Sequence, residues 1–331
     1  MIILGIETTC DETGASLVRD GQEILSHSIA SSAEIHERYG GVFPELACRR
    51  HIDAILPVIQ EAMVAPVDAI AVAKGPGLVG ALLIGMQVAK GLKIAWEKPL
   101  IGVNHVEAHL YAAFMELPAT SWLFPSLGIV LSGGHTFLVR IDAIGSYQLL
   151  GTTVDDAIGE AFDKVGTLLG LTYPGGPKVE LLAREGDPKR FPFQAGKVKI
   201  NPLAFSFSGL KTSLLYAVRG KTLGEQEKKD LAASFQETAF SDVASKAALA
   251  MKDFPCKAIY FGGGVTCNQR LRALFKERFP SHPLFFPPLH LTLDNAAMIG
   301  GLGYHLLLNK PEGDPLTLNV HPRIDLTNLR L

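Results

Sequence analysis

One pattern occurs twice in this chain and limits its fold more than any other feature: a short apolar run, a polar turn and a second apolar run. The first copy spans residues 2–19 with its polar turn at 7–13, and the second spans 127–141 with its turn at 132–136. Each copy predicts a β-hairpin with a polar tip. The distance between the copies indicates an internal duplication, although hairpins are common and the repeat alone is weak evidence.

Helical and strand patterns alternate between and after the two hairpins. Apolar residues at helical spacing predict helices, and short apolar runs that end at glycine predict buried strands. The expected strands are residues 68–73, 100–103 and 258–261, and the expected helices are residues 43–63, 78–94, 104–117, 157–169, 231–252, 268–278 and 295–308. This alternation predicts an α/β chain with mainly parallel pairing, folded as two hairpin-led lobes with a cleft between them.

Composition restricts the class of protein. With 331 residues, 47% of them apolar, the chain can bury a large core, which excludes a disordered chain and a small disulfide scaffold. The four cysteines form no CxxC pair and the N-terminal residues have no basic flank, so we expect a cytoplasmic protein without a signal peptide. The most apolar stretch, residues 78–89, is too short to span a bilayer, and no transmembrane helix or membrane partner is expected.

Charge is distributed unevenly along the chain. Residues 178–229 contain 11 Lys and Arg residues against 5 Asp and Glu residues, a balance of +6, whereas the whole chain has a net charge of −2. The remainder therefore carries −8. Such asymmetry indicates an anionic partner, and a solvated helical face is the alternative of equal weight.

The sharpest local signal is the sequence NHVEAH at residues 104–109. Histidines at i and i+4 share one helix face, with Cβ atoms about 5–6 Å apart, which suits two ligands of one metal ion. Asn104 is the expected N-cap, and Glu107 is expected to complete a capping box. Two unrelated histidines remain the alternative interpretation of His105 and His109.

A metal site needs a third ligand, and Asp294 stands at the start of the last predicted helix. The alternative role of Asp294 is to cap that helix. Two histidines and one carboxylate leave coordination positions open, as iron(II) sites often do, and zinc or magnesium also suits such a set.

Glycine-rich turns follow predicted strands at residues 74–77, 132–134, 173–177 and 262–264. None matches a P-loop, and each alone is compatible with a plain tight turn. Four of them at strand ends indicate that backbone approaches a phosphate or nucleotide.

Several charged residues lie near these turns. The carboxylates that we expect near such turns are Asp11, Glu12, Asp163 and Glu180. Asp155 and Asp156 precede a predicted helix and are expected to cap it, whereas Asp163 lies inside that helix and is harder to explain as a cap. The run of Arg49, Arg50 and His51 is expected on a solvated helix face.

Taken together, these motifs resemble the TsaD family, the bacterial threonylcarbamoyltransferases that modify transfer RNA and were formerly named O-sialoglycoprotein endopeptidases. The matching segments run along nearly the whole chain, at residues 5–13, 41–51, 75–80, 104–109, 131–136, 155–164, 173–177, 205–212, 262–268 and 294–299. Leu293 and Lys74 depart from the residues usual in the family, and both neighbour the expected site.

The resemblance implies a fold and a reaction. The fold would be an actin-like, Hsp70-like and sugar-kinase-like pair of duplicated lobes around a nucleotide cleft, with residues 1–103 and 295–331 in one lobe and 104–294 in the other. The reaction would transfer the threonylcarbamoyl group of threonylcarbamoyl-adenylate to N6 of the adenosine 3′ of the anticodon, in tRNAs that read ANN codons, with release of AMP.

The resemblance also implies site residues, cofactors and partners. One metal ion per subunit, expected to be iron(II), would be bound by His105, His109 and Asp294, and an adenine nucleotide, either threonylcarbamoyl-AMP or ATP, would lie in the cleft. Substrate contacts carry over to Val130, Leu131, Ser132, Gly133, Gly134, Asp163, Gly176, Glu180 and Asn268. Asp11 is the candidate general base. The implied partners are tRNA, a TsaB-like paralogue, a TsaE-like ATPase and a separate synthase that supplies the acyl-adenylate.

Three other functions remain possible at this point: a metalloprotease, a sugar or acetate-type kinase and a non-catalytic nucleotide-binding scaffold. The protease is disfavoured because Val106 follows His105, where the HExxH motif has the Glu that polarises water. The scaffold is disfavoured because a complete set of metal ligands is present. Formation of ADP in the presence of sugars or acids would identify the kinase.

Overall fold

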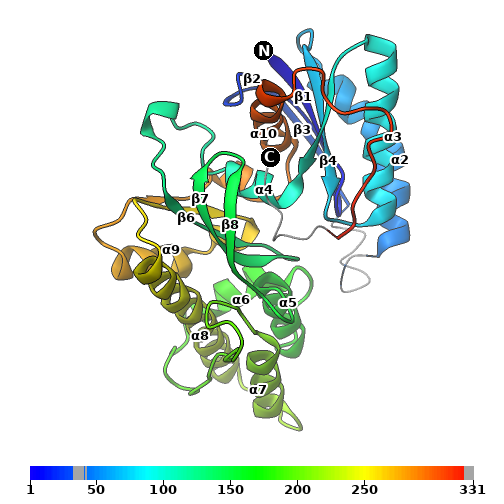
Figure 1. Cartoon of the computed structure of the whole chain (residues 1–331). Coiled ribbons are helices and arrows are strands. Elements are labelled where there is room, and N and C mark those ends of the chain that lie inside the picture. The colour runs from blue at the N-terminus through cyan, green and yellow to red at the C-terminus, as the bar shows by residue number, and fades with distance from the viewer. Residues whose placement is uncertain (33–40, 42, 324–331) are drawn as a thin grey trace. The chain divides into compact units, whose positions relative to one another are not determined.

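The computed structural model describes residues 1–32, 41 and 43–323, and residue 42 of the motif at 41–51 lies outside them (Figure 1). Contacts divide the chain into two compact units. The first unit comprises Met1–Trp122, Ala143–Tyr147 and Pro287–Leu331, and the second comprises Leu123–Asp142 and Gln148–Phe286. This division assigns residues 104–122 and 287–294 to the first unit, unlike the lobe bounds expected from sequence, which stay a prediction.

The first unit is built on a mixed five-stranded sheet of order β3-β2-β1-β4-β5. Strand β1 pairs antiparallel with β2 and parallel with β4, and β2 and β3 pair antiparallel while β4 and β5 pair parallel. Its elements are β1 (Ile2–Glu7), β2 (Glu12–Arg19), β3 (Glu23–Ser31), α2 (Pro44–Ala62), β4 (Ala69–Gly75), α3 (Val79–Trp96), β5 (Leu100–Asn104), α4 (His105–Tyr111), α10 (Ala296–Asn309) and the 3-10 turns η1 (Ala119–Ser121) and η3 (Leu289–Leu291).

The second unit has a sheet of order β10-β9-β6-β7-β8, in which β6 pairs antiparallel with β7 and parallel with β9, and β9 pairs parallel with β10. Its elements are β6 (Ser126–Leu131), β7 (Thr136–Ala143), β8 (Ser146–Thr152), α5 (Ile158–Leu168), α6 (Gly175–Ala183), α7 (Ser208–Val218), α8 (Glu225–Asp253), β9 (Ile259–Gly262), η2 (Gly264–Cys267), α9 (Gln269–Arg278) and β10 (Leu284–Phe285). The sequence patterns did not predict α6 or α7.

The two sheets repeat one connectivity. In each, the first strand (β1 or β6) lies in the middle, its hairpin partner follows on one side, and two later strands continue the sheet in parallel on the other side. The predicted internal duplication and the α/β class are therefore confirmed. The expectation of mainly parallel pairing is wrong, because each hairpin adds antiparallel strands to one half of its sheet.

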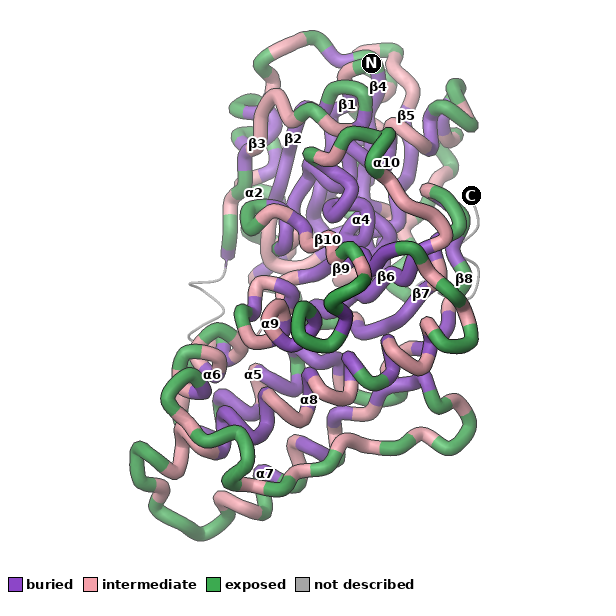
Figure 2. Tube along the Cα trace, turned by 90° about the vertical axis from the view of Figure 1, so that its left-hand side faces the viewer, coloured by how far each residue is buried: buried purple, intermediate pink, exposed green. Residues whose placement is uncertain are grey.

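Helices cover both faces of the first sheet. Figure 1 shows α2 and α3 on one face and α10 on the other, and α4 packs against α10, β4 and β5. Apolar side chains such as Ile55 of α2, Met86 of α3 and Val72 of β4 form the core on the first of these faces. In Figure 2, strands β1, β2, β4 and β5 and helix α4 are largely buried, whereas the edge strand β3 is mostly half-buried.

A close approach between α10 and β1 places the start of α10 at the end of β1. A Cβ added at Gly5 would lie 2.1 Å from the carbonyl oxygen of Ala296 and 2.7 Å from the amide nitrogen of Gly300. Only glycine allows backbones to meet this closely. The segment that precedes α10, which carries Asp294, therefore lies beside the carboxyl end of β1.

Helix α3 is the one helix among the described residues that is long and apolar enough to cross a membrane, with 18 residues of mean hydropathy 1.3. No such helix was expected from the sequence, because its most apolar stretch ends before Lys90. In the structure, Ala81, Leu82, Gly85, Met86 and Ala89 are buried. The apolar character of α3 is thus explained in part by its packing on the sheet.

Candidate functional site

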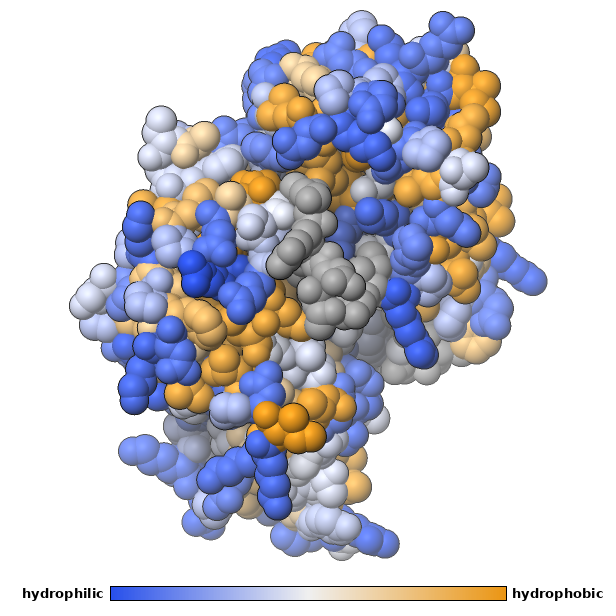
Figure 3. Space-filling view, viewed as in Figure 1, coloured by the Kyte–Doolittle hydropathy of each residue, from blue (hydrophilic) through white to orange (hydrophobic). Residues whose placement is uncertain are grey.

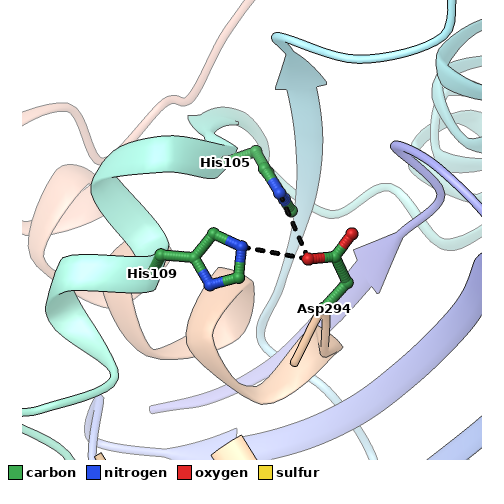
Figure 4. A group of neighbouring side chains, drawn as sticks. All are labelled: His105, His109 and Asp294. Carbon is green, nitrogen blue, oxygen red and sulfur yellow. Dashed lines mark hydrogen bonds and ion pairs between the residues drawn. The ribbon is translucent and has the colours of Figure 1, made fainter. Parts of the chain in front are cut away.

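Helix α4 positions two histidines at the carboxyl end of β5. The predicted N-cap is confirmed, because the Asn104 side chain accepts hydrogen bonds from the amides of Val106 and Glu107 at 2.9 and 3.3 Å. The strand runs directly into the helix, so His105 and His109 are fixed on its first turns. Figure 4 shows both rings turned toward Asp294.

Asp294 meets the two histidines from the segment before α10. It does not cap that helix, because Asn295 does so by accepting a hydrogen bond from the Met298 amide at 3.0 Å. One carboxylate oxygen of Asp294 lies 3.0 Å from Nε2 of His109 and 3.5 Å from Nε2 of His105 (Figure 4). The structure thus brings together three residues that the sequence places almost 190 positions apart.

The second nitrogen of His105 is held by a carboxylate. Nδ1 of His105 lies 2.9 Å from Oε2 of Glu7, which is fully buried at the end of β1, and 3.3 Å from the Thr9 hydroxyl. Burial lowers the pKa of His105, but the Glu7 and Asp294 carboxylates outweigh it and raise the pKa to about 9. A carboxylate on Nδ1 leaves Nε2 as the ligand atom, as in many metal sites.

The donor set fits a metal ion. One ligand atom from each of His105, His109 and Asp294 lies within 4.8 Å of the other two. Two imidazole nitrogens and a carboxylate oxygen suit iron, zinc and related divalent ions. The two histidines are buried and Asp294 is half-buried.

An acidic turn lies beside this triad. The turn that joins β1 to β2 carries Asp11 and Glu12, and burial together with the Asp294 and Asp11 carboxylates raises the pKa of Glu12 to about 10. Burial and the Asp11 and Asp294 charges also raise the pKa of the Cys10 thiol. Asp11, the candidate base, therefore belongs to a cluster of carboxyl groups around Asp294.

Two expectations about helices near the triad are wrong. Glu107 forms no hydrogen bond to the Asn104 amide among the described residues; its carboxyl is buried, and burial raises its pKa to about 7. His51 is not on a solvated face: Arg49 and Arg50 are exposed, but the imidazole of His51 is buried against the acidic turn. The helical period of α2 points residue 51 inward, as it does Ile55.

In the second unit, the turn after β6 exposes backbone. The amide and hydroxyl of Ser132 form hydrogen bonds with the backbone of His135, whereas Gly133 and Gly134 are exposed. Within the described ranges, neither glycine amide has a hydrogen-bond partner in the protein. Val130 and Leu131 are buried in β6 and support this turn. Free amides in a turn are suited to bind an anion.

Two further glycine contacts pack neighbouring segments against this turn. Gly263 has a φ of +89°, and a Cβ there would lie 2.5 Å from the carbonyl oxygen of Leu131. The amide of Gly159, at the start of α5, donates to the carbonyl of Ser132 at 3.2 Å. The turns at 132–134 and 262–264 are therefore neighbours at one edge of the second sheet.

Asp163, Gly176 and Glu180 also lie together. Oδ1 of Asp163 accepts from the amides of Gly175 and Gly176 at 2.8 and 2.9 Å, so Asp163 caps α6, a helix that the sequence patterns did not reveal. Glu180, one turn further on α6, accepts from the amide of Gln269 at 3.0 Å and pairs with Arg184. These bonds use one carboxylate oxygen of each residue.

Asn268 is buried and has a structural role. Its side-chain oxygen caps α9 by accepting from the amides of Arg270 and Leu271, and its amide nitrogen donates to Gln236 at 2.7 Å. Its proposed contact with substrate stays a prediction.

The expected capping of α5 by Asp155 and Asp156 is wrong. The N-cap of α5 is Ala157, without a side-chain hydrogen bond. Asp155 instead accepts from the hydroxyls of Ser206 and Ser208 and from the amide at the start of α7, and hydrogen bonding lowers its pKa despite partial burial. Asp156 pairs with Lys164 and Lys211. The pair therefore anchors the motif at residues 205–212.

Comparison with known proteins identifies the family. The model of the TsaD family, tRNA N6-adenosine threonylcarbamoyltransferase, matches residues 23–301. The chain belongs to the TsaD family. It is 52% identical to the tRNA N6-adenosine threonylcarbamoyltransferase of Protochlamydia amoebophila over the full length of both chains, and 48% identical to that of Anaeromyxobacter dehalogenans over 97% of this chain and 98% of the relative. This TsaD-family chain is therefore a transferase of tRNA-modifying type.

Solved structures confirm the fold expected for a TsaD-family chain. HypF from T. kodakarensis matches with a TM-score of 0.63 and 15% identity over 93% of this chain, which corresponds to 48% of that protein. A ROK family protein from Streptococcus pneumoniae matches with a TM-score of 0.53 and 14% identity over 94% of this chain and all of that one. The duplicated actin-like, sugar-kinase-like architecture is thus confirmed.

Several residues around the triad were not expected from the sequence. Glu7, Thr9 and His51 were not proposed, although the first two lie in the motif at residues 5–13. A charged residue that ends an otherwise apolar strand was the available signal for Glu7, because a buried carboxylate needs a partner.

Proposed function

We propose that this chain transfers the threonylcarbamoyl group from threonylcarbamoyl-adenylate to N6 of the adenosine 3′ of the anticodon, in tRNAs that read ANN codons, with release of AMP, and that the reaction depends on a metal ion. The observation that carries the proposal is the cluster of His105, His109 and Asp294, with both histidines buried, in a member of the TsaD family. The family match names a transferase and gives no support to the kinase or the protease alternative.

The metal ligands in this proposal are Nε2 of His105, Nε2 of His109 and a carboxylate oxygen of Asp294. A bound ion, proposed to be iron(II) with zinc or magnesium as alternatives, would supply a Lewis acid for the phosphate of the leaving AMP. Glu7 accepts the Nδ1 proton of His105 and so directs Nε2, as the ligand atom, at Asp294.

The chemical step itself needs few groups from the protein. The N6 amine attacks the carbamoyl carbon, the bond from that carbon to the phosphate oxygen breaks, and AMP leaves with the electron pair. The amine loses one proton, and we propose Asp11 as its acceptor. Because the acyl-adenylate is already activated, most of the rate comes from orientation and charge stabilisation.

The second unit supplies the proposed contacts to the adenine nucleotide and the threonyl group. The exposed amides of Gly133 and Gly134 are suited to phosphate or carbonyl oxygens. The remaining proposed contacts are Val130, Leu131, Ser132, Asp163, Gly176, Glu180 and Asn268. Both hydrogen bonds of Glu180 use Oε1, so its Oε2 is suited to accept from hydroxyl or amino groups of substrate, and the carboxylate of Asp163 is of the same acceptor type.

Docking of tRNA is proposed for the basic segment at residues 178–229. Several of its basic residues pair with neighbouring carboxylates, such as Lys229 with Glu185. Six others are exposed and form no ion pair with the described part of the chain: Lys189, Arg190, Lys197, Lys199, Arg219 and Lys221. The face in Figure 3 carries long hydrophilic side chains at the end where Figure 1 places α7. Unpaired cations on a surface are the usual contacts of RNA phosphates.

We propose the cytoplasm as the location, and a TsaB-like paralogue, a TsaE-like ATPase and a separate acyl-adenylate synthase as partners. These proposals rest on family membership.

The deciding experiment incubates the chain and these partners with threonylcarbamoyl-adenylate and unmodified tRNA, followed by nucleoside analysis. The proposal expects threonylcarbamoyl-modified adenosine and one AMP per modification, both lost on chelation and restored by the metal. Modification that needs neither this chain nor the metal would contradict it. ADP formation from ATP with a small acceptor would favour the kinase instead.

A further inference from the structure

His51 joins the two ends of the acidic turn. Its imidazole belongs to α2 and is 1% exposed. Nε2 lies 3.0 Å from the carbonyl oxygen of Cys10, and Nδ1 lies 2.8 Å from the hydroxyl of Thr13. Asp11 and Glu12 lie between these two anchor points. A single buried ring therefore spans the segment that carries both carboxylates.

Hydrogen-bond chemistry determines which nitrogen is protonated. The Cys10 carbonyl can only accept, so Nε2 of His51 must carry a proton and donate. In the neutral ring Nδ1 then accepts, and the Thr13 hydroxyl donates to it. Both ring nitrogens are satisfied, and neither Cys10 O nor Thr13 Oγ1 has another hydrogen-bond partner in the described part of the chain. Removing the ring would leave the buried Thr13 hydroxyl and the partly buried Cys10 carbonyl unpaired.

The same turn begins at the metal-ligand cluster. The Thr9 hydroxyl lies 3.3 Å from Nδ1 of His105 and donates to Asp294 at 3.5 Å. The Thr9 amide donates to Glu7 at 2.6 Å. The turn is thus fixed to the triad at Thr9 and to α2 through His51, with Asp11 and Glu12 held between the two.

We propose that His51 is a positioning residue for the transfer reaction: it sets the place and direction of the Asp11 and Glu12 carboxylates beside Asp294. This inference rests on the proposed function, since it assigns the turn to the same reaction. His51 is not a metal ligand in this proposal, and it acts on the turn through the backbone carbonyl of Cys10 and the hydroxyl of Thr13.

The test compares three variants of the full-length chain in the complete transfer assay. His51→Phe keeps a ring of similar shape without hydrogen bonds. His51→Gln keeps one hydrogen-bond donor and one acceptor. In the glutamine amide both are bonded to one carbon, and in the imidazole both nitrogens are likewise bonded to one ring carbon. Ser28→Ala is the matched control, because it also breaks a hydrogen bond between α2 and the sheet, the one that Ser28 donates to Glu61 at 2.6 Å. Glu61 lies ten residues, or about 15 Å along the helix, from His51.

The expected result separates positioning from general stability. A displacement of about 1 Å can cost on the order of 100-fold in rate, so His51→Phe should lower kcat by about that factor, with KM for tRNA and metal content unchanged. His51→Gln should recover most of the loss, and Ser28→Ala should keep the kcat of the unaltered chain. Equal kcat in His51→Phe and Ser28→Ala would overturn the proposal, as would a loss in His51→Gln as large as in His51→Phe.

Amide hydrogen exchange gives a readout that does not depend on the reaction. His51→Phe should speed exchange in the segment of residues 8–14 and Ser28→Ala should not, and unchanged exchange in that segment would contradict the role of His51. If His51→Phe fails to fold, Thr13→Val removes one of the two anchors and takes its place. If the unaltered chain forms no modified adenosine, the proposed function fails, whereas the exchange result still decides whether His51 holds the turn.

Discussion

Replacing Glu7 by glutamine is expected to weaken metal binding without removing a ligand. Oε1 of Glu7 accepts from the Thr9 amide at 2.6 Å, and Oε2 lies 2.9 Å from Nδ1 of His105. In Glu7→Gln the amide oxygen must stay on the Thr9 side, because the Thr9 N–H needs an acceptor. The new NH₂ group then faces Nδ1 of His105, which becomes the acceptor.

This change moves the proton of His105 to the wrong nitrogen. With Nδ1 accepting, the neutral ring carries its proton on Nε2, the atom that faces Asp294 and would bind the metal. Carboxylates that orient a ligating histidine are typically worth about 10–100-fold in metal affinity. That range corresponds to about 1.4–2.8 kcal/mol. The complete burial of Glu7 favours the upper part of the range, since no water can replace the lost carboxylate.

The assay is competition with a chelator of known affinity, at one pH, followed by metal analysis of the protein fraction. Glu61→Gln is the matched control, because Glu61 is also a hydrogen-bonded carboxylate of the first unit, but it lies at the far end of α2 and accepts from Ser28 of β3. Metal affinity of Glu7→Gln equal to that of the unaltered chain and of Glu61→Gln would refute the reasoning about the His105 tautomer.

Four further predictions follow from the same structure. His105→Ala or His109→Ala should lose metal and transfer activity together while the melting temperature shows a folded chain, and full metal occupancy in both would refute the site. Reversing the charge of two or three of Lys189, Arg190, Lys197 and Lys199 should weaken tRNA binding and reduce its salt dependence, whereas reversal of the paired Lys229 should do so less. Burial lowers the pKa of His305 to about 4. The free energy of unfolding should therefore fall as the pH drops from 6.5 toward 4, because in this range the unfolded chain binds a proton at His305 and the folded chain does not. His305→Asn should flatten this pH dependence in denaturant titrations. Unfolded and glycosylated proteins should not be cleaved by the metal-loaded chain, and chelator-sensitive cleavage abolished by His105→Ala would revive the protease.

Local sequence patterns were sufficient for much of the fold. The two hairpins, the α/β class and the internal duplication follow from apolar periodicity, because burial on one face of a strand or helix repeats with the period of that element. Helices α2, α3, α5, α9 and α10 begin and end within a few residues of their predicted bounds. Helices α6 and α7 were missed because glycine, proline and polar residues at their starts hide the helical period; α6 begins at Gly175 and is capped from a distance by Asp163.

The candidate site likewise combines local features that the sequence determined with contacts that only the tertiary structure shows. The i, i+4 spacing of His105 and His109 and the cap at Asn104 are local features, so the sequence alone determined that two imidazoles share one helix face. Asp294 could be named from sequence as a candidate third ligand, with helix capping as the alternative, but only the close approach of α10 to β1 at Gly5 shows how it reaches the histidines. Partners that lie far apart in sequence leave no periodic signal, which is why Glu7 at His105 and His51 at the acidic turn could be found only in the tertiary structure.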